Sequence, residues 1–556
     1  MRIVLVNWAR IWDGAAFGGG VNQYCQALAL ELIKRGHDVA SLFGGTTFTR
    51  RPSGCFIRRH DDWLGVRVFE VINSPVMAPS IVQFARPMGE VSAPELAAQV
   101  ERLMRDLRPD AVHWNNIEGF SIDCVEAVRR ATGGKARNIF SLHNYHTICP
   151  QVYLMKKHRE TCWSYDQGHD CTDCIPHENP DEARAKMEKA FALTRGGTEM
   201  PEAIKEFRSG GGVLVKAVTA GYKVVMTYAQ TRGRMPGHAV SSTDDISRAL
   251  PHPGGPGADT RGKTPHLMAE LNPPKPRDPS AVELRPLSNE VRPEPRSAKP
   301  LNDYGRRREA MVQMLSSCDR VLAVSDFVRR KFISLGVNER TIRTQAIGSR
   351  INRVIDLKPD LVFDPPEPDR DVPWDKVRNL RVHFMGYNNY YKGLHVLAEA
   401  LEIMDPRHLR KIDLSIFALD GHTIEWMFRR LEPRLGRLHY AYAYNYHDIP
   451  WMLGGKDLTV VPSVWWDNAP QTVFESLACG VPVLGANIGG IPDFVTDGHN
   501  GLLFTANSRE NLRDTLVRAI ENPWMVWGLR KNVRPGKSIE AHAVEMEAVY
   551  GGTDGA

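Results

Sequence analysis

Two carboxylates, Asp467 and Glu475, stand in the C-terminal half of the sequence with seven residues between them. Asp467 lies in a Pro- and Trp-containing stretch, 462–470, that is typical of a loop, and Glu475 lies in 472–478, where apolar residues recur at helical spacing. Carboxylates accept hydrogen bonds from neighbouring hydroxyls, so this pair is suited to hold a ribose or a sugar. The structural alternative is that Asp467 caps the loop or helix and Glu475 belongs to a solvated helical face.

The segments around these carboxylates predict a strand, a loop, a helix and a second strand. Val460 and Val461 end an apolar run, Gly480 stops the helix, and 482–485 begins another buried strand. In a parallel sheet, the loop and the helix N-terminus of such a unit lie at the carboxyl edge, where unpaired backbone N–H groups and the helix dipole favour an anion. The stretch therefore predicts a phosphate site.

The whole chain is long enough for two or three domains, with 556 residues and a formal net charge of +6. So mild a charge indicates no particular partner, and we expect no nucleic-acid binding. Residues 1–7 predict a strand rather than a signal peptide, and no later apolar run is long enough to span a bilayer. We expect a cytoplasmic protein whose nine cysteines are mostly reduced.

A glycine-rich turn, Gly18, Gly19 and Gly20, follows the first predicted strand and precedes a helix. Glycines allow backbone amides to approach a phosphate closely because no Cβ intervenes. The turn lacks the third spaced glycine of a dinucleotide fingerprint, and no acidic residue closes the second strand. This disfavours an oxidoreductase.

Two histidines, His113 and His143, end predicted strands at the edge expected to face a cleft. A lone histidine is more often a hydrogen-bonded core residue than a catalyst, so both are hypotheses as sugar contacts.

Four of the nine cysteines fall in one short segment rich in His and Asp: Cys149, Cys162, Cys171 and Cys174. A structural zinc site needs four convergent ligands, and only Cys171 and Cys174 have the spacing of a metal knuckle. The alternatives are free thiols, or a disulfide if the compartment is oxidising.

Composition changes between 180 and 305. Apolar pieces are scattered in the first part, whereas 251–300 is crowded with Pro, Gly and charge, which predicts a largely disordered insertion of unknown role. Strand and helix patterns return at Arg306. Further along, Lys392 falls at a strand-to-helix turn, where a lysine can neutralise a diphosphate.

The stretch around Asp467 and Glu475, with 489–493 and 497–504 after it, closely resembles the donor-binding segment of glycosyltransferase family 4, which comprises retaining enzymes of the group 1 type with the GT-B fold. In that family, two acidic residues separated by seven others bind the sugar and the nucleotide ribose, which implies these roles for Asp467 and Glu475. The implied catalytic set is Lys392, Asp467, Glu475 and His143. The implied donor-binding set is Gly18, Gly19, Gly20, His113, Gly386, Ala469, Pro470, Gln471 and Thr472.

The chain departs from the family pattern at three positions. The usual first glutamate is Asp467, the arginine expected after Gly386 is Tyr387, and a second histidine near His113 is replaced by Asn115. One of two cations for the diphosphate is therefore missing, unless Arg350 or another residue substitutes for it.

The resemblance implies an α/β fold of two Rossmann-like doubly wound domains facing one another across a cleft. The implied division is an acceptor-side domain in 1–179 and 306–355, the insertion in 180–305, a nucleotide-sugar-binding domain in 356–535, and a C-terminal segment, 536–556, whose helix crosses back to the first domain.

The resemblance also implies transfer of a hexose-type sugar from a nucleotide-diphosphate sugar to an acceptor hydroxyl, with retention and without a cofactor. The implied partners are the nucleotide sugar and a glycan or lipid-linked acceptor, in surface polysaccharide or lipopolysaccharide assembly, with peripheral contact at the inner face of a membrane left open. Two alternatives remain: a non-catalytic nucleotide-sugar-binding protein and a sugar-nucleotide epimerase of similar fold.

Overall fold

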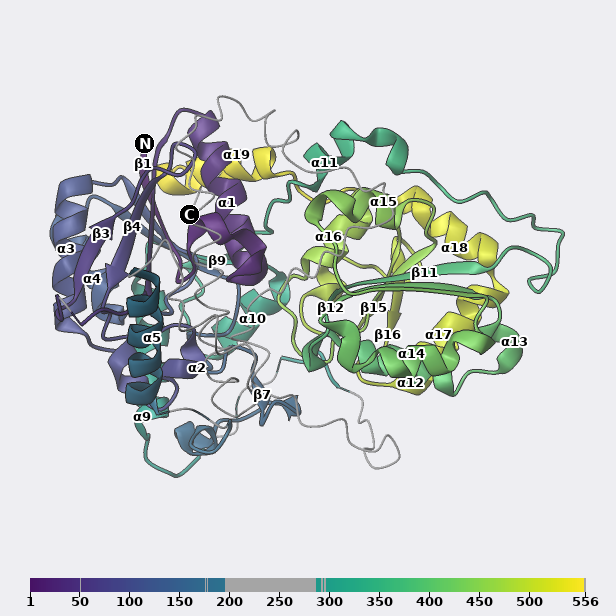
Figure 1. The fold of residues 1–556 in the computed structure, drawn as a ribbon, viewed down its shortest axis with the longest axis horizontal. Helices are drawn as coiled ribbons and strands as arrows, with labels where there is room; N and C mark the ends of the chain where they lie inside the picture. The colour runs from purple at the N-terminus through teal and green to yellow at the C-terminus, as the bar shows by residue number, and fades with distance from the viewer. Residues whose placement is uncertain are drawn as a thin grey trace, which may run out of the picture.

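The computed structural model describes residues 1–50, 52–175, 177, 179–195, 287–291, 294 and 297–554. Figure 1 shows two lobes side by side, one built around each of two large β-sheets. Most of the predicted insertion, including the part expected to be disordered, lies outside the described residues.

The first lobe contains an eight-stranded sheet with the strand order β10-β9-β6-β5-β1-β2-β4-β3. Only β3 runs antiparallel to its neighbour; the other pairs are parallel. The strands are β1 (Arg2–Val6), β2 (Asp38–Thr47), β3 (Phe56–Arg59), β4 (Arg67–Ile72), β5 (Ala111–Trp114), β6 (Arg137–Leu142), β9 (Arg320–Ala323) and β10 (Ile342–Thr344). The central strands are short apolar runs buried on both faces, as expected of a parallel sheet covered by helices.

Helices cover this sheet, and the chain returns to it after the undescribed segment. The helices of the first lobe are α1 (Gly19–Lys34), α2 (Ser80–Gln83), α3 (Pro94–Leu107), α4 (Ile122–Thr132), α5 (Pro180–Arg195), α9 (Asp303–Ser317) and α10 (Asp326–Ser334). A small hairpin of β7 (Met155–Lys156) and β8 (Glu160–Thr161) projects from the lobe. Strand β9 pairs with β6, so residues on both sides of the insertion share one sheet.

The second lobe contains a six-stranded sheet, all of whose pairs are parallel, in the order β13-β12-β11-β14-β15-β16. Its strands are β11 (Leu380–Tyr387), β12 (Ile412–Leu419), β13 (Arg437–Ala441), β14 (Leu458–Val461), β15 (Val483–Ala486) and β16 (Gly501–Phe504). Its helices are α11 (Ile351–Leu357), α12 (Leu394–Glu402), α13 (Pro406–Leu409), α14 (Glu425–Leu431), α15 (Ile449–Leu453), α16 (Gln471–Ala478), α17 (Arg509–Glu521) and α18 (Pro523–Leu529). Both lobes therefore have the Rossmann-like pattern of parallel strands linked by helices.

The last helix, α19 (Ile539–Gly551), leaves the second lobe and lies among the elements of the first (Figure 1). Its Tyr550 hydroxyl lies 2.9 Å from Nδ1 of His113 on β5, and Nε2 of its His542 lies 2.8 Å from the Tyr24 hydroxyl on α1. Two segments connect the lobes, one around Ser349 and one at 537–539, and they pair with each other. The Ser349 backbone N–H donates to the Lys537 carbonyl, and the Ile539 N–H donates to the Ser349 carbonyl.

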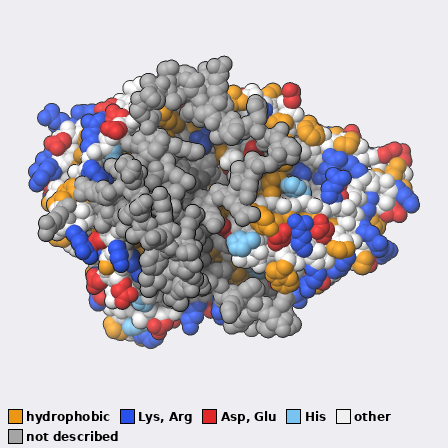
Figure 2. Space-filling model, viewed as in Figure 1, with side chains coloured by type: hydrophobic (Ala, Val, Ile, Leu, Met, Phe, Trp, Pro, Cys, Tyr) orange, Lys and Arg blue, Asp and Glu red, His pale blue; other side chains and the backbone are white. Residues whose placement is uncertain are grey.

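Among the described residues, no helix combines the length and apolar character that crossing a membrane requires. On the face drawn in Figure 2, the described Lys and Arg side chains are interspersed with Asp and Glu.

Candidate functional site

The candidate site is built where β14 ends and α16 begins. Asp467 lies in the intervening loop and is buried, and its Oδ2 atom accepts hydrogen bonds from Lys392 Nζ at 2.8 Å and from Ser463 Oγ at 3.2 Å. Lys392 comes from the turn between β11 and α12, which Asn389 caps by accepting from the Lys392 backbone N–H. Two neighbouring strands of the sheet thus bring the predicted cation and the first predicted carboxylate into one ion pair.

Glu475 lies on α16 and is 5 % exposed. Burial raises the pKa of its carboxyl to about 7, although Lys392 and Arg350 act in the opposite direction. The Glu475 charge also acts on the hydroxyls of Tyr444 and Tyr446, whose pKa values are raised mainly by burial. Within the described part of the chain, no side chain donates a hydrogen bond to this carboxylate, which leaves it available to a ligand.

Arg350 approaches the same carboxylate from the start of α11. Its guanidinium lies over the Tyr446 ring, 4.9 Å from the ring centroid, and burial lowers its pKa. Its buried Nε atom has no hydrogen-bond partner among the described residues. A second cation therefore stands near Glu475, and its role as a substitute for the arginine missing at Tyr387 stays a prediction.

The glycine turn of the first lobe meets the start of α16. Gln471 Nε2 donates a hydrogen bond to the Gly20 carbonyl at 3.0 Å, across the boundary between the lobes. Gly18 has a φ of 92° and caps α1, and a Cβ there would lie 2.5 Å from the Cβ of Ala9. The N-termini of α1 and α16 consequently lie close to one another, with backbone N–H groups on both sides.

The remaining predicted donor contacts lie around these two turns. Ala469 and Pro470 lead into α16, Pro470 occupies its N-cap position, and Thr472 lies in its first turn. Gly386 lies next to the end of β11, where a Cβ would meet open space, and the side chain after it is the exposed Tyr387.

His143 follows β6 and packs against the Tyr24 ring, with centroids 4.7 Å apart. Its Nε2 atom lies 3.3 Å from Asn115 Oδ1, and burial lowers its pKa to about 3, so the ring is neutral at pH 7. His113 is in a different environment, because its ring is fully buried between Tyr550 and Ser141, which engage both nitrogens. The prediction of a donor contact at His113 does not fit this position; the residue anchors α19 instead.

The zinc prediction for Cys149, Cys162, Cys171 and Cys174 needs correction. In the described ranges, no group of three or more His, Cys, Asp or Glu side chains is arranged to hold a metal ion. All four are free cysteines, and burial raises the pKa of the Cys149 thiol to about 11 and that of Cys162 to about 12.

An aromatic cluster beside Asp467 was not predicted. The Tyr153 and Tyr391 rings stack with centroids 4.1 Å apart, Trp465 packs edge-on against Tyr153, and the Tyr145 hydroxyl donates to the Trp466 carbonyl at 2.8 Å. These contacts join the segment between β6 and β7 of the first lobe to the Asp467 loop and to the turn after β11. Each partner is an ordinary aromatic residue in the sequence, so only the fold reveals the cluster.

A short segment that follows the undescribed residues also runs beside this loop. The Trp466 indole N–H donates to the Ser288 carbonyl at 3.3 Å, and Asn289 Nδ2 donates to the Gly489 carbonyl at 3.2 Å. Residues 287–291 therefore lie beside the site, which the motif pattern did not predict.

The region that carries this site is similar to known proteins. Residues 373–537 match the family model of glycosyl transferases group 1. The matched region contains Lys392, Asp467 and Glu475, and it covers the second sheet from β11 to β16.

Two curated relatives show the same kind of partial match. The UDP-glycosyltransferase TURAN of Arabidopsis thaliana is 27% identical over 222 residues, which cover 38% of this chain and 45% of the relative. The O-antigen chain mannosyltransferase B of Escherichia coli is 20% identical over 224 residues, which cover 38% of this chain and 55% of the relative. The chain thus spans about half the length of the curated relatives it matches.

The fold extends over both lobes. The structure of a sucrose-phosphate synthase from Thermosynechococcus elongatus superposes with a TM-score of 0.51 at 13% sequence identity, covering 100% of this chain and 99% of that one. Together with the two large, mainly parallel sheets, this similarity confirms the predicted GT-B architecture.

Proposed function

We propose that this protein is a retaining glycosyltransferase that moves a hexose-type sugar from a nucleotide-diphosphate sugar to an acceptor hydroxyl. The observation that carries the proposal is the convergence, at the start of α16, of the Lys392–Asp467 ion pair and the Glu475 carboxylate, which accepts no side-chain hydrogen bond from the described residues, inside the region that matches group 1 glycosyl transferases.

The diphosphate of the donor would lie between the N-termini of α1 and α16. The Gly18–Gly20 turn and the first turn of α16 offer backbone N–H groups to its oxygens, and Lys392 offers an ammonium group. Lys392 would exchange part of its contact with Asp467 for contact with the diphosphate, which frees Asp467 to accept from sugar hydroxyls. Arg350 would supply the second cation that Tyr387 does not.

Glu475 would hold the ribose by accepting hydrogen bonds from its hydroxyls. The ribose hydroxyls would donate the hydrogen bonds that the buried Glu475 carboxylate does not receive from the described side chains. These hydrogen bonds would favour the ionised form of the carboxyl. Ala469, Pro470, Gln471 and Thr472 would position the sugar and diphosphate through the backbone of their loop.

In the reaction, the bond from the anomeric carbon to the diphosphate oxygen breaks and the bond to the acceptor oxygen forms on the same face of the sugar. The acceptor proton passes to the departing phosphate oxygen, so no protein base is required. Lys392 and the helix N-termini stabilise the negative charge that develops on the leaving diphosphate. His143, neutral at pH 7, would be a hydrogen-bonding sugar contact.

We further propose a role in surface polysaccharide or lipopolysaccharide assembly, which the name of one relative, an O-antigen chain mannosyltransferase, supports. The acceptor would then be a glycan or a lipid-linked glycan. A lipid-linked acceptor would bring the protein to the inner face of a membrane, and this location stays a prediction.

The test is a donor screen with the full chain, in which UDP-, GDP- and ADP-sugars are supplied and release of nucleoside diphosphate is followed. Glu475→Ala is compared with Glu510→Ala, which removes a carboxylate exposed at the start of α17. Slow hydrolysis of one donor that is lost in Glu475→Ala and kept in Glu510→Ala would support the transferase. Donor binding without turnover, even with acceptor-containing extract, would instead favour the non-catalytic binder that Tyr387 and the Lys392–Asp467 pairing also allow.

A further inference from the structure

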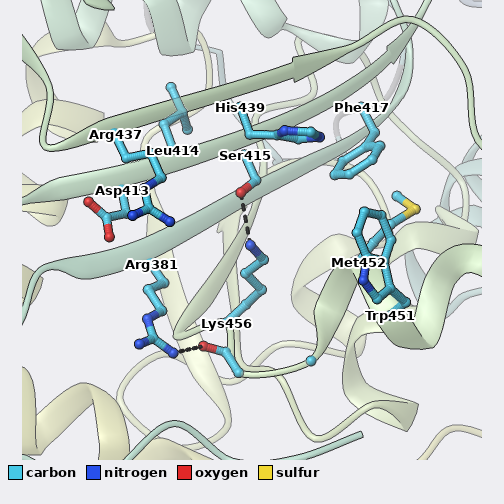
Figure 3. A pocket seen from close by; sticks show the side chains of 12 residues that line it. Arg381, Asp413, Leu414, Ser415, Phe417, Arg437, His439, Trp451, Met452 and Lys456 are labelled. Atoms are coloured by element: carbon cyan, nitrogen blue, oxygen red, sulfur yellow. Dashed lines mark hydrogen bonds between the residues drawn. The ribbon is translucent and has the colours of Figure 1, made fainter. Parts of the chain in front are cut away.

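A second pocket, of about 430 Å³, lies in the second lobe near the amino ends of the strands, away from the candidate donor site. It opens over β11, β12 and β13, and the residues 451–456 from α15 and the turn after it form its other wall (Figure 3). Arg381 lies near the start of β11, whereas the turn that carries Lys392 follows the end of that strand. At about 3.3 Å per residue, the six steps from Arg381 to the end of β11 put the Arg381 end of the pocket roughly 20 Å from the Lys392 turn.

Strand register places the polar lining residues of this pocket in rows. The first row is Arg381, Asp413 and Arg437, which are Cα partners across β11, β12 and β13. The second row is Ser415 and His439 of the lining, with the buried His383 in register beside Ser415. Side chains at alternate positions of a strand share a face, so both rows project from the same face of the sheet.

Cations outnumber carboxylates in the pocket lining, where Arg381, Arg437 and Lys456 face Asp413 alone. Lys456 Nζ donates to Ser415 Oγ at 2.8 Å, and an Arg381 guanidinium N–H donates to the Gly455 carbonyl at 3.3 Å (Figure 3). Within the described residues, none of the three cations forms an ion pair with a carboxylate. The lining therefore holds an excess of positive charge, three cations to one carboxylate, inside a concave surface where an anion would bind.

A buried histidine behind the pocket also lacks polar partners among the described residues. His383 is fully buried beside Phe417, and neither ring nitrogen has a hydrogen-bond partner among the described residues. Burial, with Arg381 and Arg437 nearby, lowers the pKa of Lys456, although the Asp413 and Asp457 carboxylates act in the opposite direction.

Aromatic side chains also line the pocket. Trp451 is 54 % exposed and packs edge-on against Phe417 at 6.0 Å between ring centroids, and the His439 ring lies 5.1 Å from Phe417. An exposed indole beside a cationic pocket offers an apolar face to a ring-shaped ligand, while the cations hold its charged group.

We propose that this pocket is a second ligand site, which binds a monosaccharide-sized anion with its phosphate or carboxylate on Arg381, Arg437 and Lys456 and its ring against Trp451. The site is separate from the donor site and does not depend on the reaction proposed above. Its position on the outer part of the donor-binding lobe suits a regulator or a second sugar subsite.

The test is calorimetric titration of the full chain with glucose 6-phosphate, glucuronate, glucose and inorganic phosphate, each with and without saturating UDP. We expect glucose 6-phosphate or glucuronate to bind equally well with UDP present, and glucose and inorganic phosphate to bind more weakly. The stronger of the two anionic sugars shows whether phosphate or carboxylate is preferred.

Variants place the binding in the pocket. Arg437→Gln removes one charged hydrogen-bond donor and is expected to weaken binding about tenfold. Trp451→Ala is expected to weaken binding of the sugar anions but to leave inorganic phosphate unchanged. The matched controls, Arg407→Gln and Trp426→Ala, remove exposed side chains elsewhere in the lobe and should have no effect.

Three outcomes would overturn the proposal. They are an absence of binding by either anionic sugar at millimolar concentration, displacement of the bound sugar by UDP, and unchanged affinity in a folded Arg437→Gln variant. Circular dichroism verifies the fold of each variant, and both substituted side chains are exposed, so the fold should tolerate the changes.

Discussion

The Nζ atom of Lys392 lies 2.8 Å from the Oδ2 atom of Asp467, and this pair joins the turn after β11 to the loop after β14. Lys392 is partly exposed, whereas Asp467 is nearly buried. In the proposed reaction, the Lys392 ammonium group would move its hydrogen bond from the Asp467 carboxylate to a donor phosphate. The pair would then both stabilise the structure and take part in the reaction.

Replacing Lys392 with Met should lower the rate of nucleoside diphosphate release about 10²–10³-fold, because a fixed donor to the developing charge is lost. Steady-state release of nucleoside diphosphate is the measurement. Lys376→Met, at an exposed position of the same lobe, is the control and should keep full activity. An active Lys392→Met enzyme would remove Lys392 from the proposed mechanism.

Glu475 should make the protein less stable as pH rises from about 4.5 to 7. The folded carboxyl has a pKa of about 7 against an ordinary 4.5, so the folded state binds the proton more tightly and loses that advantage on deprotonation. The loss is on the order of 3 kcal/mol for a shift of this size. Glu475→Gln lacks it, so urea unfolding should show the variant gaining stability relative to the wild type between pH 5 and pH 8.

Glu510→Gln serves as the control for this pH series because its carboxyl lies near the surface. A stability difference between Glu475→Gln and the wild type that stays constant with pH would contradict the assigned pKa. Nucleotide affinity offers a second readout, since the ionised carboxylate should bind the ribose more tightly above pH 7.

Glu90 should be the carboxylate on which acid stability of the first lobe depends most. Burial alone would raise its pKa, but Arg307 and His146 lower it to about 2. The pair with Arg307, which is fully buried on α9, ties the chain after the insertion to the chain before it. Glu90→Gln leaves the guanidinium without its counter-ion and should cost about 3–5 kcal/mol at pH 7.

This destabilisation should shrink as pH falls from about 4.5 to 2, because the wild-type carboxylate is then protonated as well. Chemical unfolding at several pH values measures the effect. Glu126→Gln, in an exposed helical ion pair, should cost less than about 1 kcal/mol. Similar losses in the two variants would show that the buried pair adds no more than a surface pair.

Gly18→Ala should impair the approach of the two lobes. The residue adopts a φ of 92°, and an added Cβ would lie 2.5 Å from the Ala9 side chain, so the turn before α1 must shift. We expect weaker donor binding together with a lower melting temperature. Gly36→Ala is the matched control, since it has a similar φ of 85° but nothing lies within 4 Å of an added Cβ. Equal effects would attribute the loss to backbone strain alone.

Much of this arrangement could be predicted from local patterns. The β14–α16–β15 unit, the glycine turn before α1 and the lysine before α12 depend on apolar periodicity and turn residues, which the sequence displays directly. The GT-B architecture was implied by the resemblance to glycosyltransferase family 4, whose motifs lie on such units.

Contacts between distant segments could not be predicted in this way. The stacking of Tyr153 on Tyr391 and the burial of His113 against Tyr550 depend on how two lobes and a returning helix pack. The same strand-end position indicated a cleft residue at both histidines, yet Tyr550 of α19 hydrogen-bonds to the ring of His113. The cysteine spacing was misleading because it records proximity along the chain and not convergence of four side chains around a point.

The pairing of the two crossings at Ser349 and 537–539 affects how the lobes can move. Two hydrogen-bonded chains form a short ribbon, which bends more easily across its flat face than within its plane. We therefore expect the lobes to open and close about one preferred axis, which passes through this ribbon. The donor would then enter, and the nucleotide would leave, on the side of the cleft opposite the ribbon, so the two steps would have to occur one after the other.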